Sequence, residues 1–148
     1  MKTSIRVQRE DFDLNKEVTL LAGDGESGAV ASLTGHVRKE KDLSILTLEH
    51  YPHMTEAEIA RLVTEAGSRW ALTGVTVVHR VGSLRPGERI VLVAVASQHR
   101  QAAFAACEFL MDYLKTHAPF WKEETRGAEH HWVEHRVSDD EAAKRWEK

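Results

Sequence analysis

Short runs rich in β-branched residues alternate along the chain with segments of helical periodicity, and this alternation predicts a mixed α+β domain. The strand-like runs are residues 4–8, 28–37, 44–51, 74–82, 88–97 and 130–137. Residues 90–96 are apolar at every position, which is typical of a strand buried on both faces. We expect residues 74–97 to form a hairpin in a mixed or antiparallel sheet, with the helices packed against it.

Two helices carry recognisable start signals. Thr55 with Glu58, and Ser138 with Glu141, match the capping box, in which a hydroxyl and a carboxylate satisfy backbone amides at a helix start. These signals predict helices over residues 56–70 and 139–146.

A third helix is expected after the buried strand, with Ser97 as its candidate cap. Apolar residues recur there at three- and four-residue spacings and define one face, namely Phe104, Cys107, Met111 and Leu114. Proline disfavours helical geometry in the residue before it, so Pro119 predicts a helix end near Thr116. We expect a loop to follow, carrying Phe120, Trp121 and Lys122.

The composition limits the class of protein. A chain of 148 residues has the usual size of one domain, and we expect a single domain over residues 1–148. Its 20 Lys and Arg against 23 Asp and Glu give a net charge of −3, without the excess of basic residues typical of nucleic-acid binding. The lack of an apolar run of roughly 20 residues argues against membrane insertion. One cysteine and an N-terminus without a signal-peptide core favour a cytoplasmic location.

Positive charge gathers at both ends of the third helix, with His99 and Arg100 at its start and Lys115 and Lys122 near its end. Free backbone amides at a helix start, together with an arginine, form a natural site for a phosphate. The alternative for the lysines is structural, because cations near a helix C-terminus are stabilised by its dipole and most lysines are solvated.

Other chemistries have weaker support. His131 and His135 have a four-residue spacing that suits zinc on a helix, but they fall in a predicted strand, so we expect no metal site. Ser97 lacks the sequence context of a nucleophilic serine. Cys107 lies among apolar helix positions and is expected to be an inert core thiol. We expect no cofactor.

Five ordered blocks resemble the large, catalytic subunit of molybdopterin synthase, the family that makes the dithiolene of the molybdenum cofactor. They are GAVASLTGHVR (28–38), LTLEHYPHMTE (46–56), HRVGSLRPGE (79–88), the segment 97–124, and WVEHRVSD (132–139). The resemblance covers nearly the whole chain. It implies an α/β hammerhead-like fold and a sulfurtransferase activity.

The resemblance implies that Lys115 and Lys122 are catalytic, and it places further residues in or near the substrate pocket: Arg38, His99, Arg100, Met111 and Arg136. In this family the sulfur arrives as the C-terminal Gly-Gly thiocarboxylate of a small ubiquitin-like carrier subunit. The acceptor is cyclic pyranopterin monophosphate. Two large subunits form a central homodimer with one carrier at each outer end, which makes a heterotetramer.

The chain departs from the family pattern at two places. Leu33 stands where an aromatic residue usually precedes the TGxVR segment, and the loop between Arg38 and Leu46 is short. We expect these changes to affect pterin stacking or carrier docking and to leave the lysines in place. A non-catalytic anion-binding or scaffold protein of the same fold is the alternative function, because it needs only the cluster at the helix start.

The length of the third helix bears on assembly. Arg100 and Lys115 are 15 residues apart, which corresponds to roughly 22 Å along a continuous helix. One small pterin cannot contact both residues of the same chain. We therefore expect either two ligands, or a pocket in which a second copy of the chain supplies His99 and Arg100.

Overall fold

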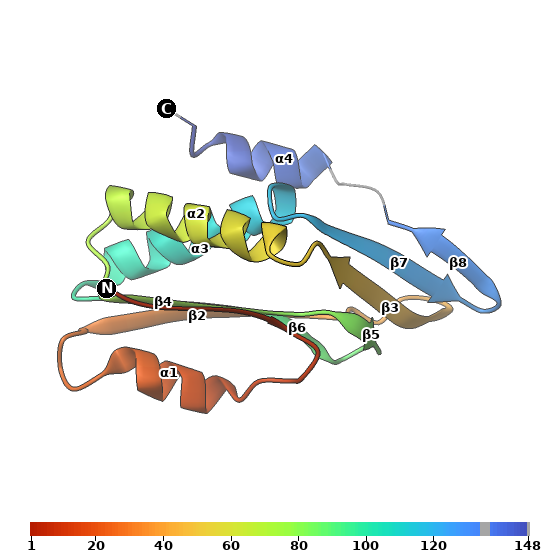
Figure 1. Cartoon of the computed structure of the whole chain (residues 1–148), viewed down its shortest axis with the longest axis horizontal. Coiled ribbons are helices and arrows are strands. Elements are labelled where there is room, and N and C mark those ends of the chain that lie inside the picture. Colours follow the sequence, from red (N-terminus) through yellow and green to blue (C-terminus); the bar gives the residue numbers. More distant parts are fainter. Residues whose placement is uncertain (134–136, 148) are drawn as a thin grey trace.

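The computed structural model describes residues 1–133 and 137–147. Within them the chain forms two four-stranded sheets and flanking helices (Figure 1). The elements are β1 (Lys2–Gln8), α1 (Leu14–Ala22), β2 (Ala29–His36), β3 (Leu43–His50), α2 (Met54–Arg69), β4 (Gly74–Arg80), β5 (Gly82–Leu84), β6 (Arg89–Ser97), α3 (Arg100–Thr116), β7 (Phe120–Arg126), β8 (Glu129–Trp132) and α4 (Val137–Lys144). The predicted α+β class is confirmed.

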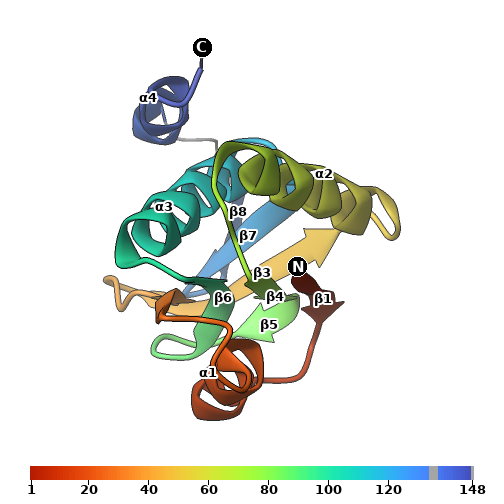
Figure 2. The ribbon, with the colours of Figure 1, turned by 90° about the vertical axis from the view of Figure 1, so that its left-hand side faces the viewer.

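Sheet A has the strand order β1-β4-β6-β2, with β1 and β4 parallel and the other neighbours antiparallel. The predicted pairing of residues 74–80 with 89–97 is confirmed, and the short strand β5 lies in their connection. Helix α1 covers one face of the sheet, and α2 and α3 cover the other (Figure 2). Both faces are therefore buried, which explains why the sequence of β6 is apolar without alternation.

The side chains of β6 point alternately to the two faces of sheet A. Val91, Val93 and Val95 belong to the large cluster with α2 and α3, whereas Leu92 and Ala94 pack with Phe12 and Leu21 on the α1 side. Successive side chains of a strand point to opposite faces, so one continuous apolar run serves two separate cores.

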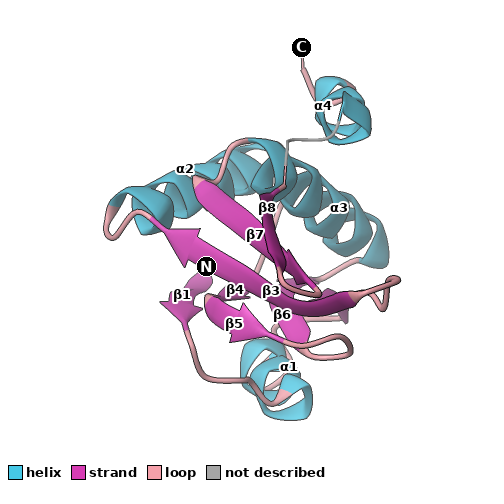
Figure 3. Ribbon diagram, turned by 90° about the vertical axis from the view of Figure 1, so that its right-hand side faces the viewer, coloured by secondary structure: helices cyan, strands magenta, loops and turns pink. Residues whose placement is uncertain are grey.

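Sheet B is antiparallel, with the order β5-β3-β7-β8 (Figure 3). It has a smaller core of four buried residues, Val37, Leu46, Leu48 and Leu84. The register of β3 with β7 sets Phe120 opposite His50 and Lys122 opposite Leu48. The prediction of a loop over residues 120–122 was wrong, because these residues pair with β3 to extend the sheet.

Helix α1 was not predicted. Its N-cap is Asp13, whose side chain accepts a hydrogen bond from the Lys16 amide at 3.1 Å. It ends at Gly23, which has a φ of 68° that glycine adopts without strain. The aspartate cap and the following apolar spacing were the available signals, but the segment is short and partly polar.

The predicted cap of α2 was also wrong, because the helix starts one residue before Thr55 and its N-cap is His53. Thr55 is fully buried inside the first turn. Its hydroxyl donates to the Pro119 carbonyl at 2.9 Å and accepts from the Tyr51 amide at 3.1 Å. The hydroxyl thus joins the start of α2 to the segment that follows α3.

Helix α3 ends at Thr116, as predicted, but its N-cap is His99 and not Ser97. The Ser97 hydroxyl donates instead to the Ala71 carbonyl at 2.8 Å. Cys107 and Leu114 are buried as expected, whereas Phe104 is 67% exposed. Ala103 and Ala106 take the core positions beside sheet A, so Phe104 lies outside the buried face.

Near the C-terminus, β8 covers only the first part of the predicted strand, and α4 begins before Ser138. Helix α4 packs on α3, where the Trp146 indole donates to Asp112 Oδ2 at 2.7 Å. Two residues of interest, His135 and Arg136, lie outside the described residues. None of the described helices has the length and apolar character that crossing a bilayer requires.

Candidate active site

The two lysines flank the short connection between α3 and β7. Lys115 is exposed on the last turn of α3, and Lys122 is half-buried in β7, opposite Leu48. The positive charges of both lysines help to lower the pKa of His79, so both lie within electrostatic reach of the same imidazole. Lys115 and Lys122 therefore lie on either side of the α3–β7 connection, in the surroundings of His79.

The connection between the lysines is held by hydrogen bonds. The His117 amide donates to the Tyr113 carbonyl at 2.7 Å, which closes the helix end. The Phe120 amide donates to the Ala118 carbonyl at 2.9 Å, and the Pro119 carbonyl accepts from Thr55. Backbone groups on both sides of the turn are thus satisfied, which favours a fixed separation of the lysines.

His79 lies beneath this connection, near the end of β4, and is 8% exposed. Its ring stacks on the Phe120 ring with a centroid separation of 3.8 Å. Burial, with a smaller contribution from Lys122, lowers the pKa of His79 to about 3, so the imidazole is neutral at physiological pH. His79 was not assigned to the site from the sequence, and its place directly after the apolar run GVTVV was the available signal.

Arg38 lies at the same end of sheet A as His79. The sheet register sets His79 of β4 and Gly35 of β2 opposite the same residue of β6, Val91. Arg38 follows the end of β2, next to the buried Val37, whose amide donates to the Glu88 carbonyl at 2.9 Å. The exposed arginine is therefore attached to a backbone held firmly against the β5–β6 connection.

His99 and Arg100 lie at the opposite end of the sheet. They follow Ser97, which pairs with Ala29 at the far end of β6, and both are exposed. Helix α3 is continuous over its 17 residues, so the expected separation of roughly 22 Å between Arg100 and Lys115 applies. Within one chain, the structure does not bring these two clusters together.

The remaining predicted pocket residues have different surroundings. Met111 is half-buried one turn before Lys115 and packs against the main core. Arg136 lies outside the described residues. Leu33, which replaces the usual aromatic residue, is 41% exposed on the edge strand β2. The short loop after Arg38 is tied to β7, because Arg126 donates to the Lys41 carbonyl and the Glu40 carboxylate, both at 2.7 Å.

Cys107 is buried, and its thiol donates to the Val93 carbonyl at 3.6 Å. Burial raises the pKa of Cys107 to about 11. The thiol is therefore protonated at neutral pH and is a poor nucleophile, in agreement with the sequence prediction.

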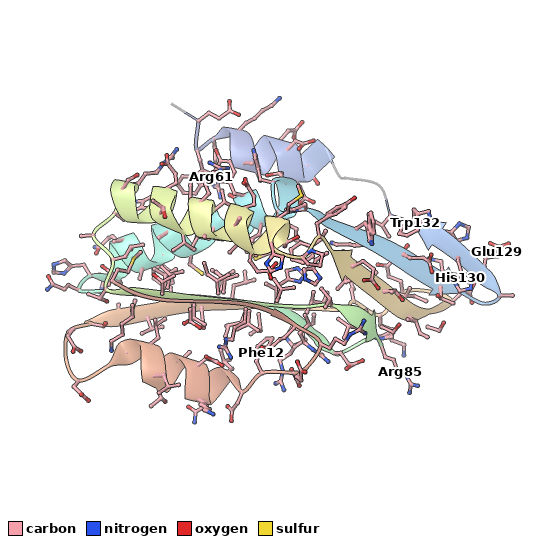
Figure 4. All side chains as sticks on the ribbon, viewed as in Figure 1. Phe12, Arg61, Arg85, Glu129, His130 and Trp132 are labelled. Atoms are coloured by element: carbon pink, nitrogen blue, oxygen red, sulfur yellow. The ribbon has the colours of Figure 1, made fainter. Side chains whose placement is uncertain are left out.

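The histidines of β8 are surface residues at the tip of the β7–β8 hairpin, where Figure 4 labels His130 beside Glu129. His130 Nδ1 lies 3.2 Å from Glu123 Oε1, and His131 Nε2 lies 3.0 Å from Glu129 Oε2. In the part of the chain that the structure describes, no group of three or more His, Cys, Asp or Glu is arranged to hold a metal ion.

Comparison with known proteins gives consistent matches. The family model described as MoaE protein matches residues 7–117. A molybdopterin synthase catalytic subunit from Mesorhizobium japonicum is 56% identical over 147 residues, covering 97% of this chain and 92% of the relative.

Two solved structures are similar over most of their length. The molybdopterin biosynthesis MoaE protein from Burkholderia ambifaria MC40-6 has a TM-score of 0.86 and 49% identity, covering 99% of this chain and 98% of that one. Molybdopterin synthase from Staphylococcus aureus has a TM-score of 0.81 and 31% identity, covering 87% and 96%. The family model matches most of the chain, and the similar sequence and structure extend over nearly all of it, so the chain belongs to the MoaE protein family.

Proposed function

We propose that this chain is the catalytic subunit of a molybdopterin synthase, a sulfurtransferase. Its substrates are cyclic pyranopterin monophosphate and the C-terminal thiocarboxylate of a small ubiquitin-like carrier subunit. The observation that carries the proposal is that Lys115 and Lys122 flank the α3–β7 connection, which stacks on the buried His79 through Phe120, in a chain of this family.

The lysines suit the chemistry of sulfur transfer. The thiocarboxylate sulfur forms a bond with a side-ring carbon of the pterin while the bond from that carbon to an oxygen substituent breaks. Water then cleaves the acyl–sulfur bond and leaves the carrier with a carboxylate. A dithiolene contains two sulfurs, so the sequence runs twice and uses two thiocarboxylated carriers. Negative charge develops on oxygen in both stages, and protons must reach the departing groups. Ammonium groups supply both the positive charge and the protons. Cys107 takes no part, because the sulfur arrives on the partner.

Arg38 is proposed to bind the phosphate of the pterin. A guanidinium can donate two parallel hydrogen bonds to phosphate oxygens, and Arg38 is exposed at the same end of sheet A as His79. Met111 contributes an apolar wall one turn from Lys115. Arg136 is assigned to the pocket through the family resemblance.

We propose that His99 and Arg100 complete the pocket of a second copy of the chain. These residues are exposed and lie far from Lys115 of their own chain. Phe104 lies one turn further along the same helix and is an exposed aromatic residue, as expected near a subunit contact. A two-fold dimer would then contain two equivalent shared pockets, with one carrier bound to each subunit in a heterotetramer.

We further propose that residues 1–148 act as one domain and that the reaction takes place in the cytoplasm. A thiocarboxylate carrier and a reduced, buried cysteine both suit a reducing compartment.

The test is reconstitution. The purified chain is mixed with cyclic pyranopterin monophosphate and a thiocarboxylated carrier, and the dithiolene product is measured. The matched control is the same carrier with an ordinary C-terminal carboxylate, which should give no product. Binding of the pterin without any product from an authentic carrier would instead favour the non-catalytic anion-binding protein.

A further inference from the structure

We propose that His79 is a positioning residue for Lys115 and Lys122, because its ring stacks on Phe120 at the start of β7 and its hydrogen bond to the Arg80 carbonyl fixes the orientation of the imidazole. The inference rests on the proposed function, because it assigns a role in the same site. It goes further by naming a residue on β4, a strand that carries neither lysine.

The first step concerns the position of Phe120. This residue is the first of β7, two residues before Lys122 and five after Lys115. Its ring lies nearly parallel to the His79 imidazole, with an interplanar angle of 19° and centroids 3.8 Å apart. The preceding carbonyl, of Pro119, is held by Thr55. Two neighbouring points between the lysines are therefore anchored by buried side chains.

The second step concerns the protonation of the ring. His79 Nδ1 lies 2.8 Å from the Arg80 carbonyl oxygen. A carbonyl only accepts hydrogen bonds, so Nδ1 carries the proton, and Nε2 of the neutral ring carries the lone pair. The backbone of Arg80 thus selects one tautomer. Arg80 is itself fixed, because its guanidinium donates to the Arg9 and Arg89 carbonyls at 3.0 Å.

The third step concerns the charges around the ring. Titratable groups from three elements surround His79: Lys122 of β7, Lys115 of α3 and His50 of β3. Helix α2 adds Glu56, whose Oε1 lies 3.9 Å from His50 Nε2. Burial, with smaller contributions from Lys122 and Lys115, lowers the pKa of His79 and outweighs the opposing hydrogen bond to the Arg80 backbone, so the ring adds no positive charge to the site. A protonated side chain at this position would repel both ammonium groups. The negative charge of the pterin phosphate would then have to offset that repulsion.

If His79 only stabilised the fold, it would still stack on Phe120, but its substitution would not lower the turnover of the folded protein. Two variants separate the possibilities. His79→Phe keeps a flat ring for stacking on Phe120 and removes both ring nitrogens. His79→Asn keeps a donor for the Arg80 carbonyl and removes the ring. The matched control is His130→Asn, at the exposed tip of the β7–β8 hairpin.

The kinetic measurement is made on the reconstituted complex, below the unfolding temperature of each variant. We expect kcat to fall about 10- to 100-fold in both His79 variants, because small displacements of catalytic groups have effects of this size. KM for the pterin should stay within about twofold, since a loss restricted to kcat marks an interaction that matters in the transition state. His130→Asn should behave as wild type.

The spectroscopic measurement is independent of activity. Nitrogen NMR of the imidazoles in the wild-type chain should show His79 as the Nδ1–H tautomer, without titration from about pH 5 to about pH 9, unlike an ordinary histidine with a pKa of about 6.5. Titration in that range, or an Nε2–H tautomer, would overturn the proposal.

The kinetic outcomes also separate the two proposals. An active wild-type complex with normal kcat in His79→Phe and His79→Asn overturns the role of His79 and leaves the proposed function intact. A His79 variant can also lose activity only because less of it is folded. If kcat returns to the wild-type value once it is calculated per folded molecule, the role of His79 is likewise overturned. A wild-type chain that makes no product from an authentic carrier rejects the proposed function, and the positioning role with it.

Discussion

Lys115 and Lys122 differ in their surroundings although they serve one proposed site. Lys115 is exposed on the last turn of α3, where the helix dipole favours a cation. Lys122 is half-buried on the face of β7 that also carries Phe120. The two residues lie on different elements, so their contributions can be tested separately by substitution.

Lys115→Ala and Lys122→Ala, made separately, should each abolish most of the turnover and leave the fold intact. Surface substitutions usually change the free energy of unfolding by no more than about 0.5 kcal/mol. The measurements are the rate of dithiolene formation and the thermal unfolding midpoint. Lys16→Ala, an exposed lysine on α1 across sheet A, is the control. Normal turnover in both site variants would refute the proposed mechanism.

Arg38→Ala should act mainly on pterin binding. Loss of a charge-assisted hydrogen bond to the phosphate costs about 1.5 to 3 kcal/mol, which corresponds to a roughly 10- to 150-fold weaker affinity. Calorimetric titration with the pterin measures this directly, with Arg61→Ala on the outer side of α2 as the control. An unchanged dissociation constant for Arg38→Ala would remove this residue from the site.

At the scale of elements, the connection between α3 and β7 is the feature that sets the site. It follows a helix whose end is fixed by Pro119, and it leads into a strand whose register with β3 is fixed by the pairing of Phe120 with His50. The buried hydroxyl of Thr55 joins this connection to the start of α2.

Thr55→Val should destabilise the chain, because it leaves the Pro119 carbonyl and the Tyr51 amide without this partner. A buried group that loses its hydrogen bond costs about 1 to 3 kcal/mol. Denaturant unfolding measures the change in free energy. Thr64→Val, an exposed position on the same helix, controls for the lower helix propensity of valine. Equal effects of the two substitutions would show that the Thr55 hydroxyl does not anchor the connection.

At the scale of the whole molecule, the charges lie at two opposite ends of sheet A. Arg38 and the two lysines lie at the end near the neutral His79, and His99 and Arg100 lie beyond the other end. A single chain therefore cannot apply both clusters to one small substrate, and a second copy is the simplest source of the missing residues.

Complementation tests this arrangement. Arg100→Ala and Lys115→Ala proteins, each inactive alone, are mixed under conditions in which subunits exchange. With random exchange about half the dimers are mixed, and each mixed dimer has one intact pocket, so activity should recover to about one quarter of wild type. The matched control mixes Lys115→Ala with Lys122→Ala, where neither pocket regains both lysines. Mixed dimers without recovery in the first mixture would mean that each chain builds its pocket alone.

Sequence patterns were most reliable where one physical constraint dominates. The apolar run of β6 had to be buried on both faces, and Pro119 had to end α3, whatever the rest of the chain did. Patterns failed where a tertiary contact competed with a local one. Thr55 has the sequence of a helix cap, but its hydroxyl bonds to Pro119, which is 64 residues away.

The sequence by itself determined the α+β class, the family blocks and the residue types at the proposed site, because these depend on composition, periodicity and order along the chain. Only the tertiary structure decided which of these residues meet. His79 is 36 residues before Lys115 and lies in a different sheet from Lys122, yet its ring stacks on Phe120, the residue that begins the strand carrying Lys122. His99 and Arg100 are nearer to Lys115 in the sequence, but the continuous helix α3 keeps them at a distance from Lys115. A helix has a fixed rise per residue, so it separates its two ends, whereas the packing of strands and helices brings distant segments together.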